Sequence, residues 1–413
     1  MNESSKLWTR QFTAIVIMAF LFFLCIQLLT AGFPAYITDV KNNPTQGGLM
    51  TTAFMVAAIV TRPLIGYLLH QVNVKIMSIV TLVFITVTIG VSYGQYSIPL
   101  LLFLRVLHGI GFGIISTIIS TMATNIIPVK RLGEGVGYYG LSTSVGTTVA
   151  PMLALSVLQF FSYNILIVLS VLLTIAALAL SFVVKAPQRE ISSNTSKKKG
   201  SFKEYAFDKK AFLPCILTSF FTVSLGGVIS FLSELGKEAD LGGSVSLFFL
   251  IMAIVMTIIR PLSGRMFDRF GHKVIIYPAV LSGIVWLFLL TITENTLTLL
   301  IAAFFYGIAY GTVTPTLQAI AVGLVTKEKQ GTANAMYFSS MDLGMAIGST
   351  SLGVLASYTG YHFIYGFSIL FLVALLITYT LLFVKGKNRH LLWRRLHNSI
   401  EFFKMENSND CLG

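Results

Sequence analysis

Charged residues are scarce in this sequence. Only 11% of its 413 residues are Asp, Glu, Lys or Arg, whereas 55% are hydrophobic. A soluble domain carries roughly 25% charged residues, so this chain has too little charge to cover the surface of a water-soluble fold. The composition excludes a soluble globular enzyme and indicates a chain that is solvated by lipid.

The sequence also has few cysteines and no phosphate-binding glycine loop. The three cysteines, Cys25, Cys215 and Cys411, have no disulfide or metal-site spacing, and the six histidines form no ligand pattern. No G-x-x-x-x-G-K-[ST] loop occurs, so ATP is not expected to drive this protein directly. We expect no metal and no cofactor.

Long apolar runs are what the sequence has in abundance. Runs of about 20 residues, each able to cross a ~30 Å hydrocarbon core as a helix, recur along the whole chain. They predict an all-α membrane protein with twelve transmembrane helices. The predicted spans are 12–36, 46–68, 76–94, 98–125, 135–158, 163–184, 211–233, 244–266, 275–293, 297–323, 332–356 and 362–384.

The net charge of +13 is a topology signal. With both termini in the cytoplasm, bases such as Lys6, Lys130 and Lys198 lie on the inner side, and acids such as Asp39 and Glu234 lie outside. The bases are scattered over many short loops, which argues against nucleic acid as a partner. We predict a multi-pass protein of the cell membrane with cytoplasmic termini.

An internal repeat divides the chain. Arg62-Pro63-Leu64 recurs as Arg260-Pro261-Leu262, and the same shift of 198 residues carries several glycines onto glycines, including Gly109 onto Gly307. Six spans form one unit, and because six is even the two units are parallel repeats about an axis along the membrane normal. The chain is expected to contain two pseudo-symmetric six-helix halves, at 1–187 and 211–386, joined by a polar cytoplasmic linker at 188–210 and followed by a basic, amphipathic cytoplasmic tail at 387–413.

Three motifs carry a resemblance to a known family. The segment 264–273 reads GRMFDRFGHK and follows the pattern G-x-L-a-D-R-x-G-R-K, span 4 contains LxxxR followed by His108-Gly109-Ile110-Gly111, and span 5 has Gly137, Gly146 and Pro151 in register. Over almost the whole chain, these features resemble the major facilitator superfamily, in particular its twelve-span drug:proton antiporters of the bacterial type. The resemblance implies a transporter of small molecules.

The resemblance assigns a conformational latch to the loop between spans 8 and 9. Its residues are Gly264, Asp268, Arg269, Gly271 and Lys273. An acid there is placed to meet a neighbouring helix N-terminus, and glycine allows close helix approach. The equivalent loop of the first half keeps Gly66 but has His70 where the acid belongs, so that loop is either a weaker or pH-sensitive latch or a solvated basic turn.

Two spans carry the other family motifs. Arg105 lies ~10 Å below the outer surface, a position that requires a polar interior, and the resemblance implies a part in proton coupling. His108 follows at i+3 and shares its helix face; it is either a further coupling residue or a hydrogen-bonded helix partner. In span 5, Gly137, Gly146 and Pro151 resemble the antiporter motif, although two of its glycines are replaced by Ala150 and Ala154 and the final one by Leu155. Glycine-rich packing alone is the alternative.

Asp342 is the most exceptional residue, because it lies ~15 Å into span 11, close to the bilayer midplane. An ionisable group at this depth indicates a functional site. We expect Asp342 to carry the coupling proton or to pair with a cationic substrate; the alternative is a static ion pair with Arg105. Polar or aromatic residues at helical spacing are expected to line the central cavity: Gln27, Tyr139, Tyr306, Tyr310 and Asn334.

The expected function is proton-coupled export of small amphiphilic organic compounds or drugs by a monomer in the lipid bilayer. One alternative is an exporter of a specific metabolite such as a siderophore, another metallophore or a sugar, in which Arg105 and His108 would bind an anionic substrate. A membrane enzyme would need clustered catalytic groups near one surface, which the sequence lacks, so no enzymatic activity is expected. A sensor or lipid flippase with the same fold is a further alternative.

Overall fold

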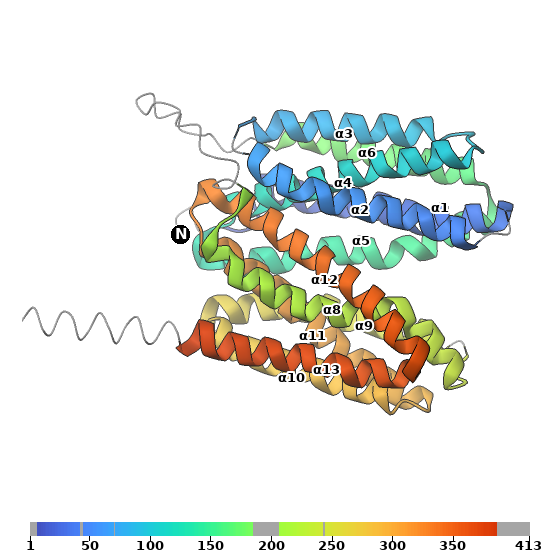
Figure 1. The fold of residues 1–413 in the computed structure, drawn as a ribbon. Helices are drawn as coiled ribbons and strands as arrows, with labels where there is room; N and C mark the ends of the chain where they lie inside the picture. Colours follow the sequence, from blue (N-terminus) through green and yellow to red (C-terminus); the bar gives the residue numbers. More distant parts are fainter. Residues whose placement is uncertain (1–5, 42–43, 70, 185–205, 243, 386–413) are drawn as a thin grey trace, which may run out of the picture.

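The structure, a computed structural model, describes residues 6–41, 44–69, 71–184, 206–242 and 244–385. In these ranges there is no strand, and twelve α-helices of at least 18 residues run along one common direction (Figure 1). The fold prediction is therefore confirmed. The helices are α1 (Arg10–Lys41), α2 (Pro44–Leu68), α3 (Val74–Val91), α4 (Ile98–Ile126), α5 (Leu132–Phe160), α6 (Tyr163–Val183), α8 (Lys209–Glu238), α9 (Ser244–Phe270), α10 (His272–Thr291), α11 (Thr296–Gly323), α12 (Gln330–Thr359) and α13 (Tyr361–Thr378).

Eleven of these twelve helices are long and apolar enough to cross a membrane, and the exception is α12. This helix carries Asn334 and Asp342 together with many small polar residues. It packs against helices of both halves, chiefly α8 and α2. Neighbouring helices therefore shield polar groups that lipid would not solvate.

Polar caps and glycines set the helix ends. Asn73, Ser162 and Asn295 accept hydrogen bonds from backbone N–H groups in the first turns of α3, α6 and α11, as expected for N-cap residues. Between α9 and α10 the chain turns at Gly271, whose φ is 77°, a conformation that favours glycine. The helix α9 continues through Pro261 and ends at Phe270. The prediction that Gly264 and Asp268 lie in a loop is therefore wrong.

The buried apolar residues form two large clusters, one within residues 14–184 and one within residues 215–379. Glycines related by the 198-residue shift make corresponding contacts in the two clusters. A Cβ at Gly113 would meet the backbone of Ala58, and one at Gly311 would meet Met256, 198 residues beyond Ala58. The repeated sequence thus produces a repeated helix packing.

The two groups of helices meet through α2 with α12 and α5 with α9. The 198-residue shift relates α2 to α9 and α5 to α12, so these two contacts are equivalent by the repeat. Figure 1 shows α1–α6 in the upper part of the view and α8–α13 in the lower part. We call the end of the bundle where the N-terminus is marked, at the left of Figure 1, the N-terminal end.

Candidate functional site

An ion pair joins α2 to α12 inside the bundle. Arg62 Nε donates to Asp342 Oδ2 at 2.6 Å, and the two side chains are 1% and 11% exposed. The alternative of a static ion pair between Asp342 and Arg105 is wrong, because Arg62 is the partner of Asp342. Since α2 and α12 belong to different repeats, the pair links the two halves.

The Arg62 guanidinium is well enclosed by polar and aromatic groups. Its Nη1 donates to Ser116 Oγ at 3.1 Å. Its central carbon lies 5.3 Å from the Phe112 ring centre and 4.9 Å from that of Phe338. These contacts stabilise a charge that would otherwise be costly inside a membrane protein.

Arg105 is fully buried in α4, and its hydrogen bonds and ring contacts among the described residues are to α1 and α2 of its own half. Its Nε donates to the Met50 carbonyl and its Nη2 to Thr30 Oγ1, both at 3.3 Å. The Phe33 and Phe54 rings lie 5.2 and 4.4 Å from the guanidinium carbon. Within the described residues no carboxylate pairs with it.

His108 is also fully buried one turn away from Arg105. It lies edge-on to Phe33 with ring centres 5.9 Å apart. Neither ring nitrogen forms a well-aligned hydrogen bond in the described ranges, although the Thr88 backbone acts on the ring. The structure therefore places His108 beside Arg105 but in an aromatic contact rather than in a chain of hydrogen bonds.

At the N-terminal end, Asp268 of α9 binds the first turn of α5. Its two carboxylate oxygens accept from the backbone N–H groups of Gly133 at 2.7 Å and Glu134 at 2.8 Å. Both N–H groups lie at a helix N-terminus, where no intrahelical acceptor is available and the helix dipole favours an anion. This is the geometry that the sequence pattern predicted for the acid.

The bases of this contact differ from the predicted ones. Glu134 accepts from Arg265 Nε at 3.0 Å and from Arg131 Nε at 2.8 Å. Arg269 is exposed over the Phe270 ring, and Lys273 is exposed on α10. Helical continuation of α9 turns Arg265 toward α5, so Arg265 and Glu134 complete the contact in place of Arg269 and Lys273. We call Arg131, Glu134, Arg265 and Asp268 the α5–α9 clasp.

Glycines bring α5 and α9 close together. A Cβ at Gly264 would lie 2.8 Å from the Glu134 Cα, and one at Gly137 would lie 2.7 Å from the Arg260 carbonyl. Gly146, in contrast, packs on Phe20 of α1 within the same half, and Pro151 is exposed on α5. Of the two antiporter-like glycines, Gly137 therefore contacts the other half and Gly146 contacts its own half.

The corresponding end of α2 is described in part. Gly66 is buried within α2, and Leu69 packs against Gly331 at the start of α12. His70 lies outside the described residues, as do most of the predicted linker at 188–210 and the tail at 387–413.

The residues predicted to line a cavity lie mostly in packed contacts. Asn334 is fully buried and joins α4 to α12, accepting from Ser120 at 2.9 Å and donating to Thr124 at 3.1 Å. Tyr306 packs between Trp286 and Tyr310 inside the second half. Tyr139 is buried and Gln27 is half-buried, and Tyr310 lies under the guanidinium of Arg260.

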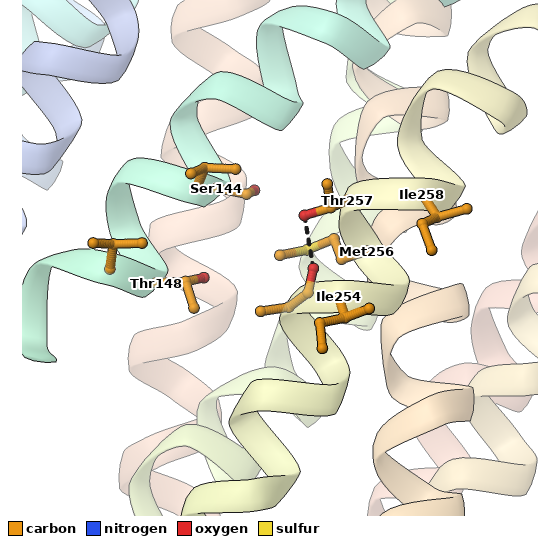
Figure 2. Close-up of a pocket in the computed structure, with 9 residues that line it drawn as sticks. Ser144, Thr148, Ile254, Met256, Thr257 and Ile258 are labelled. Carbon is orange, nitrogen blue, oxygen red and sulfur yellow. Dashed lines mark hydrogen bonds between the residues drawn. The ribbon is translucent and has the colours of Figure 1, made fainter.

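A cavity of about 280 Å³ lies between α5 and α9. Figure 2 shows Ser144 and Thr148 on α5 facing Met256 and Thr257 on α9. Its walls are otherwise apolar. None of the predicted cavity residues lines it.

Two buried arginines at the contacts between the halves, Arg62 and Arg260, were not predicted as site residues. The sequence did hold a signal for them, since both begin the repeated Arg-Pro-Leu segment. An arginine kept in both repeats within an apolar span is unusual enough to be singled out.

Comparison with known proteins agrees with this arrangement. The family model described as "Major Facilitator Superfamily" matches residues 15–297 and 279–398. The chain is 22% identical over 350 residues to multidrug resistance protein 2 of Bacillus subtilis (81% of this chain, 86% of the relative) and 22% identical over 353 residues to the multi-drug resistance efflux pump PmrA of Streptococcus pneumoniae (82% and 88%). It is 19% identical over 369 residues to the staphylopine export protein of Staphylococcus aureus (86% and 91%).

A solved structure shares the fold. The human organic anion transporter MFSD10 superposes with a TM-score of 0.75 at 15% identity, covering 89% of this chain and 98% of that chain. At this identity the likeness concerns the fold alone.

Proposed function

The chain belongs to the Major Facilitator Superfamily, and from this premise we propose that it is a secondary exporter of small amphiphilic organic compounds driven by proton antiport. A multi-pass membrane transporter of small molecules is what the family and its multidrug efflux relatives establish. The direction, the proton and the substrate class are the proposed part.

The observation that carries the proton coupling is the Arg62–Asp342 pair. It is a single buried ion pair between the halves among the described residues, at 2.6 Å. A proton on Asp342 removes its charge and leaves Arg62 without its anion, so the contact between α2 and α12 weakens. Loss of one charge of a buried ion pair destabilises the arrangement that holds the pair by about 3–5 kcal/mol. This is enough to shift the equilibrium between two arrangements of the halves.

The α5–α9 clasp supports a mechanism in which the N-terminal end of the bundle closes and opens in turn. We assign this end to the cytoplasm, with both termini there, because the bases of the short loops are concentrated on this side. The clasp then holds the cytoplasmic side closed, and its opening admits substrate from inside the cell. The two six-helix halves, 1–187 and 211–386, are the proposed moving units of a monomer.

The test is dye transport in everted membrane vesicles that contain the full chain. An imposed pH gradient, acid inside, is expected to drive uptake of ethidium without ATP. The Asp342→Asn variant is expected to bind dye but to lose the response to the gradient. Gradient-driven uptake by Asp342→Asn at the wild-type rate would overturn the role of Asp342, and no gradient-driven uptake of any probe by the wild type would overturn the proposed function.

An exporter of one specific metabolite is the second candidate. The observation that favours it is the staphylopine export protein among the relatives, matched over 91% of its length. Competition between unrelated dyes for uptake separates the two candidates, because a broad exporter is inhibited by many amphiphiles whereas a dedicated one is not.

A further inference from the structure

Four polar side chains form a hydrogen-bonded cluster between the two halves: Ser120 and Thr124 of α4, Gln318 of α11 and Asn334 of α12. Gln318 Nε2 donates to Ser120 Oγ at 2.8 Å and to Asn334 Oδ1 at 3.0 Å. The Ser120 hydroxyl in turn donates to Asn334, which donates to Thr124. None of the four residues is more than 5% exposed. We call these residues the central polar cluster.

The repeat places this cluster on its own axis. Ser120 and Gln318 are 198 residues apart and therefore occupy equivalent positions of the two halves. A two-fold axis passes midway between any two equivalent positions, and these two side chains touch, so the axis passes through the cluster. Because the axis of a parallel repeat runs along the membrane normal, a transport path between the halves must pass this point.

At the level of the cluster, α4 and α11 are buried on every side. All residues from 115 to 124 of α4 and from 311 to 322 of α11 are buried. Ser120 lies roughly 9 Å before the end of α4, from the rise of a helix, so this closed section belongs to the N-terminal end of the bundle. A helix section with no exposed face leaves no opening beside it. The halves therefore close the path here.

Packing alone does not require polar groups at this place. The repeat equivalents of Thr124 and Asn334 are Val322 and Val136, which are also buried. Valines thus occupy the equivalent positions on the other side of the axis, whereas an amide and a hydroxyl bridge the halves on this side. A neutral hydrogen bond contributes modest net stability, because water replaces it when the two groups separate. Such bonds hold two surfaces in one register and still let them part.

We propose that the central polar cluster is the gate that closes the transport path at the N-terminal end, with Gln318 as its central donor. When the halves separate at this end, the bonds from Gln318 to Ser120 and from Asn334 to Thr124 break, and the freed side chains line the opened path. The α5–α9 clasp joins the halves beside the axis, whereas the cluster blocks the passage itself. This rests on the proposed function, because it identifies the gate of the same transport path.

Access of a thiol reagent to a position just beyond the cluster tests the gate. Thr314 lies one helical turn further from the N-terminal end than Gln318, on the same face of α11, and is 4% exposed. Its hydroxyl donates to the Tyr310 carbonyl of its own helix, so Thr314→Cys leaves the cluster intact. The reporter is the full chain with Thr314→Cys and without its three native cysteines. A membrane-impermeant maleimide added to everted vesicles then labels it at a rate that follows the population open at the N-terminal end.

Ser120→Ala and Ser170→Ala form a matched pair in this reporter. Both serines are fully buried, but Ser170 donates to the Leu166 carbonyl within α6, whereas Ser120 accepts from and donates to the other half. Ser120→Ala is expected to raise the labelling rate about tenfold, because two inter-half hydrogen bonds of modest strength are lost. Ser170→Ala is expected to leave the rate unchanged. Equal labelling of the two variants would overturn the proposal.

Gln318→Leu is a second test, because leucine keeps much of the side-chain volume and removes the central donor. It is expected to raise labelling as strongly as Ser120→Ala does. The double variant is expected to gain far less than the product of the two single increases, since both substitutions break the same contact. An increase equal to that product would contradict a shared gate. If Gln318→Leu does not fold, the two serine variants still decide.

The outcomes separate this gate from the proposed function, because labelling needs neither a gradient nor a substrate. A wild type that drives ethidium uptake with a proton gradient, combined with equal labelling of Ser120→Ala and Ser170→Ala, keeps the function and overturns the gate. Faster labelling of Ser120→Ala in a protein that shows no gradient-driven transport keeps the gate and overturns proton-coupled export.

Discussion

Arg62 and Asp342, 280 residues apart in the sequence, lie 2.6 Å apart between the two halves. The equivalent contact on the other side of the repeat axis, between α5 and α9, has no acid at this depth but has Asp268 at the N-terminal end. At the position equivalent to Asp268, the first half has His70. The acids of the two inter-half contacts thus lie at different depths, Asp342 inside the bundle and Asp268 with Glu134 at the N-terminal end, and the two contacts are expected to respond differently to protons.

The Arg62–Asp342 pair is predicted to be energetically coupled. Asp342→Asn or Arg62→Gln alone is expected to lower the free energy of unfolding by about 3–5 kcal/mol, because each leaves a buried group without its partner. The double variant is expected to lose less than the sum of the single losses. Chemical denaturation of the four proteins in detergent measures the coupling, and additive losses would contradict it.

Much of the fold was predictable because it depends on local composition. The lengths of the apolar runs predicted the membrane-spanning helices, and the 198-residue shift predicted the repeat. Both can be read from the sequence without knowing how distant segments pack. The position of Asp268 against a helix N-terminus was also predictable, because the helix dipole makes this end of a helix favourable for an anion.

The pairing of charges was not predictable in the same way. Which arginine meets Asp342 depends on how α2 of one half packs against α12 of the other, and no local sequence pattern records that. Likewise, the choice of Arg265 over Arg269 depends on the exact residue at which α9 ends, because one extra turn of helix rotates a different base toward α5.

The α5–α9 contact is predicted to tolerate no side chain at Gly264. Gly264→Ala places a methyl group 2.8 Å from the Glu134 Cα, so the two helices must separate and transport is expected to fall at least tenfold. Gly90→Ala is the matched control, since no atom lies within 4 Å of the added Cβ, and it is expected to be neutral or slightly stabilising. The measurement is the initial rate of dye uptake by each variant at equal expression. Equal rates for the two variants would contradict the prediction.

The Asp268 carboxylate is predicted to stabilise the closed clasp. Asp268→Asn replaces one accepting oxygen by an NH₂ donor that faces a backbone N–H, so one of the two hydrogen bonds is lost along with the charge. A loss of about 1–2 kcal/mol is expected. Labelling of a cysteine placed at Leu132, which is 8% exposed and packs against Gly323, by a membrane-impermeant maleimide measures opening, with the single Leu132→Cys variant as the reference. Unchanged labelling would argue against the clasp.

Arg105 and His108 are predicted to behave differently although they are neighbours. Arg105→Lys is expected to abolish transport, because one ammonium does not reach both the Met50 carbonyl and Thr30 Oγ1 while stacking on Phe54. His108→Gln is expected to retain at least half of the activity, because the imidazole makes an aromatic contact and no well-aligned hydrogen bond among the described residues, and the Gln amide can still reach the Thr88 backbone. Uptake rates of both variants at matched expression are the measurement, and an inactive His108→Gln would restore the coupling role of His108.

The start of α8 is predicted to give the protein a pH-dependent stability. Asp208 caps this helix by accepting from Lys210 N–H at 2.8 Å and pairs with Lys329 Nζ at 3.2 Å. Partial burial acts to raise the pKa of Asp208, but the Lys210 hydrogen bond and the Lys329 ammonium outweigh it and hold the pKa below its usual range.

A depressed folded-state pKa means that the stabilisation is present above the unfolded-state pKa and is lost as the pH falls through the folded-state pKa. Asp208→Asn retains a capping side chain but removes the charge. Its melting temperature is therefore expected to lie below that of the wild type at pH 7. The difference is expected to shrink once the pH falls below the usual aspartate pKa of about 4 and to vanish below the lowered folded-state pKa of Asp208. A difference of the same size at pH 3 and pH 7 would show that the charge of Asp208 contributes nothing.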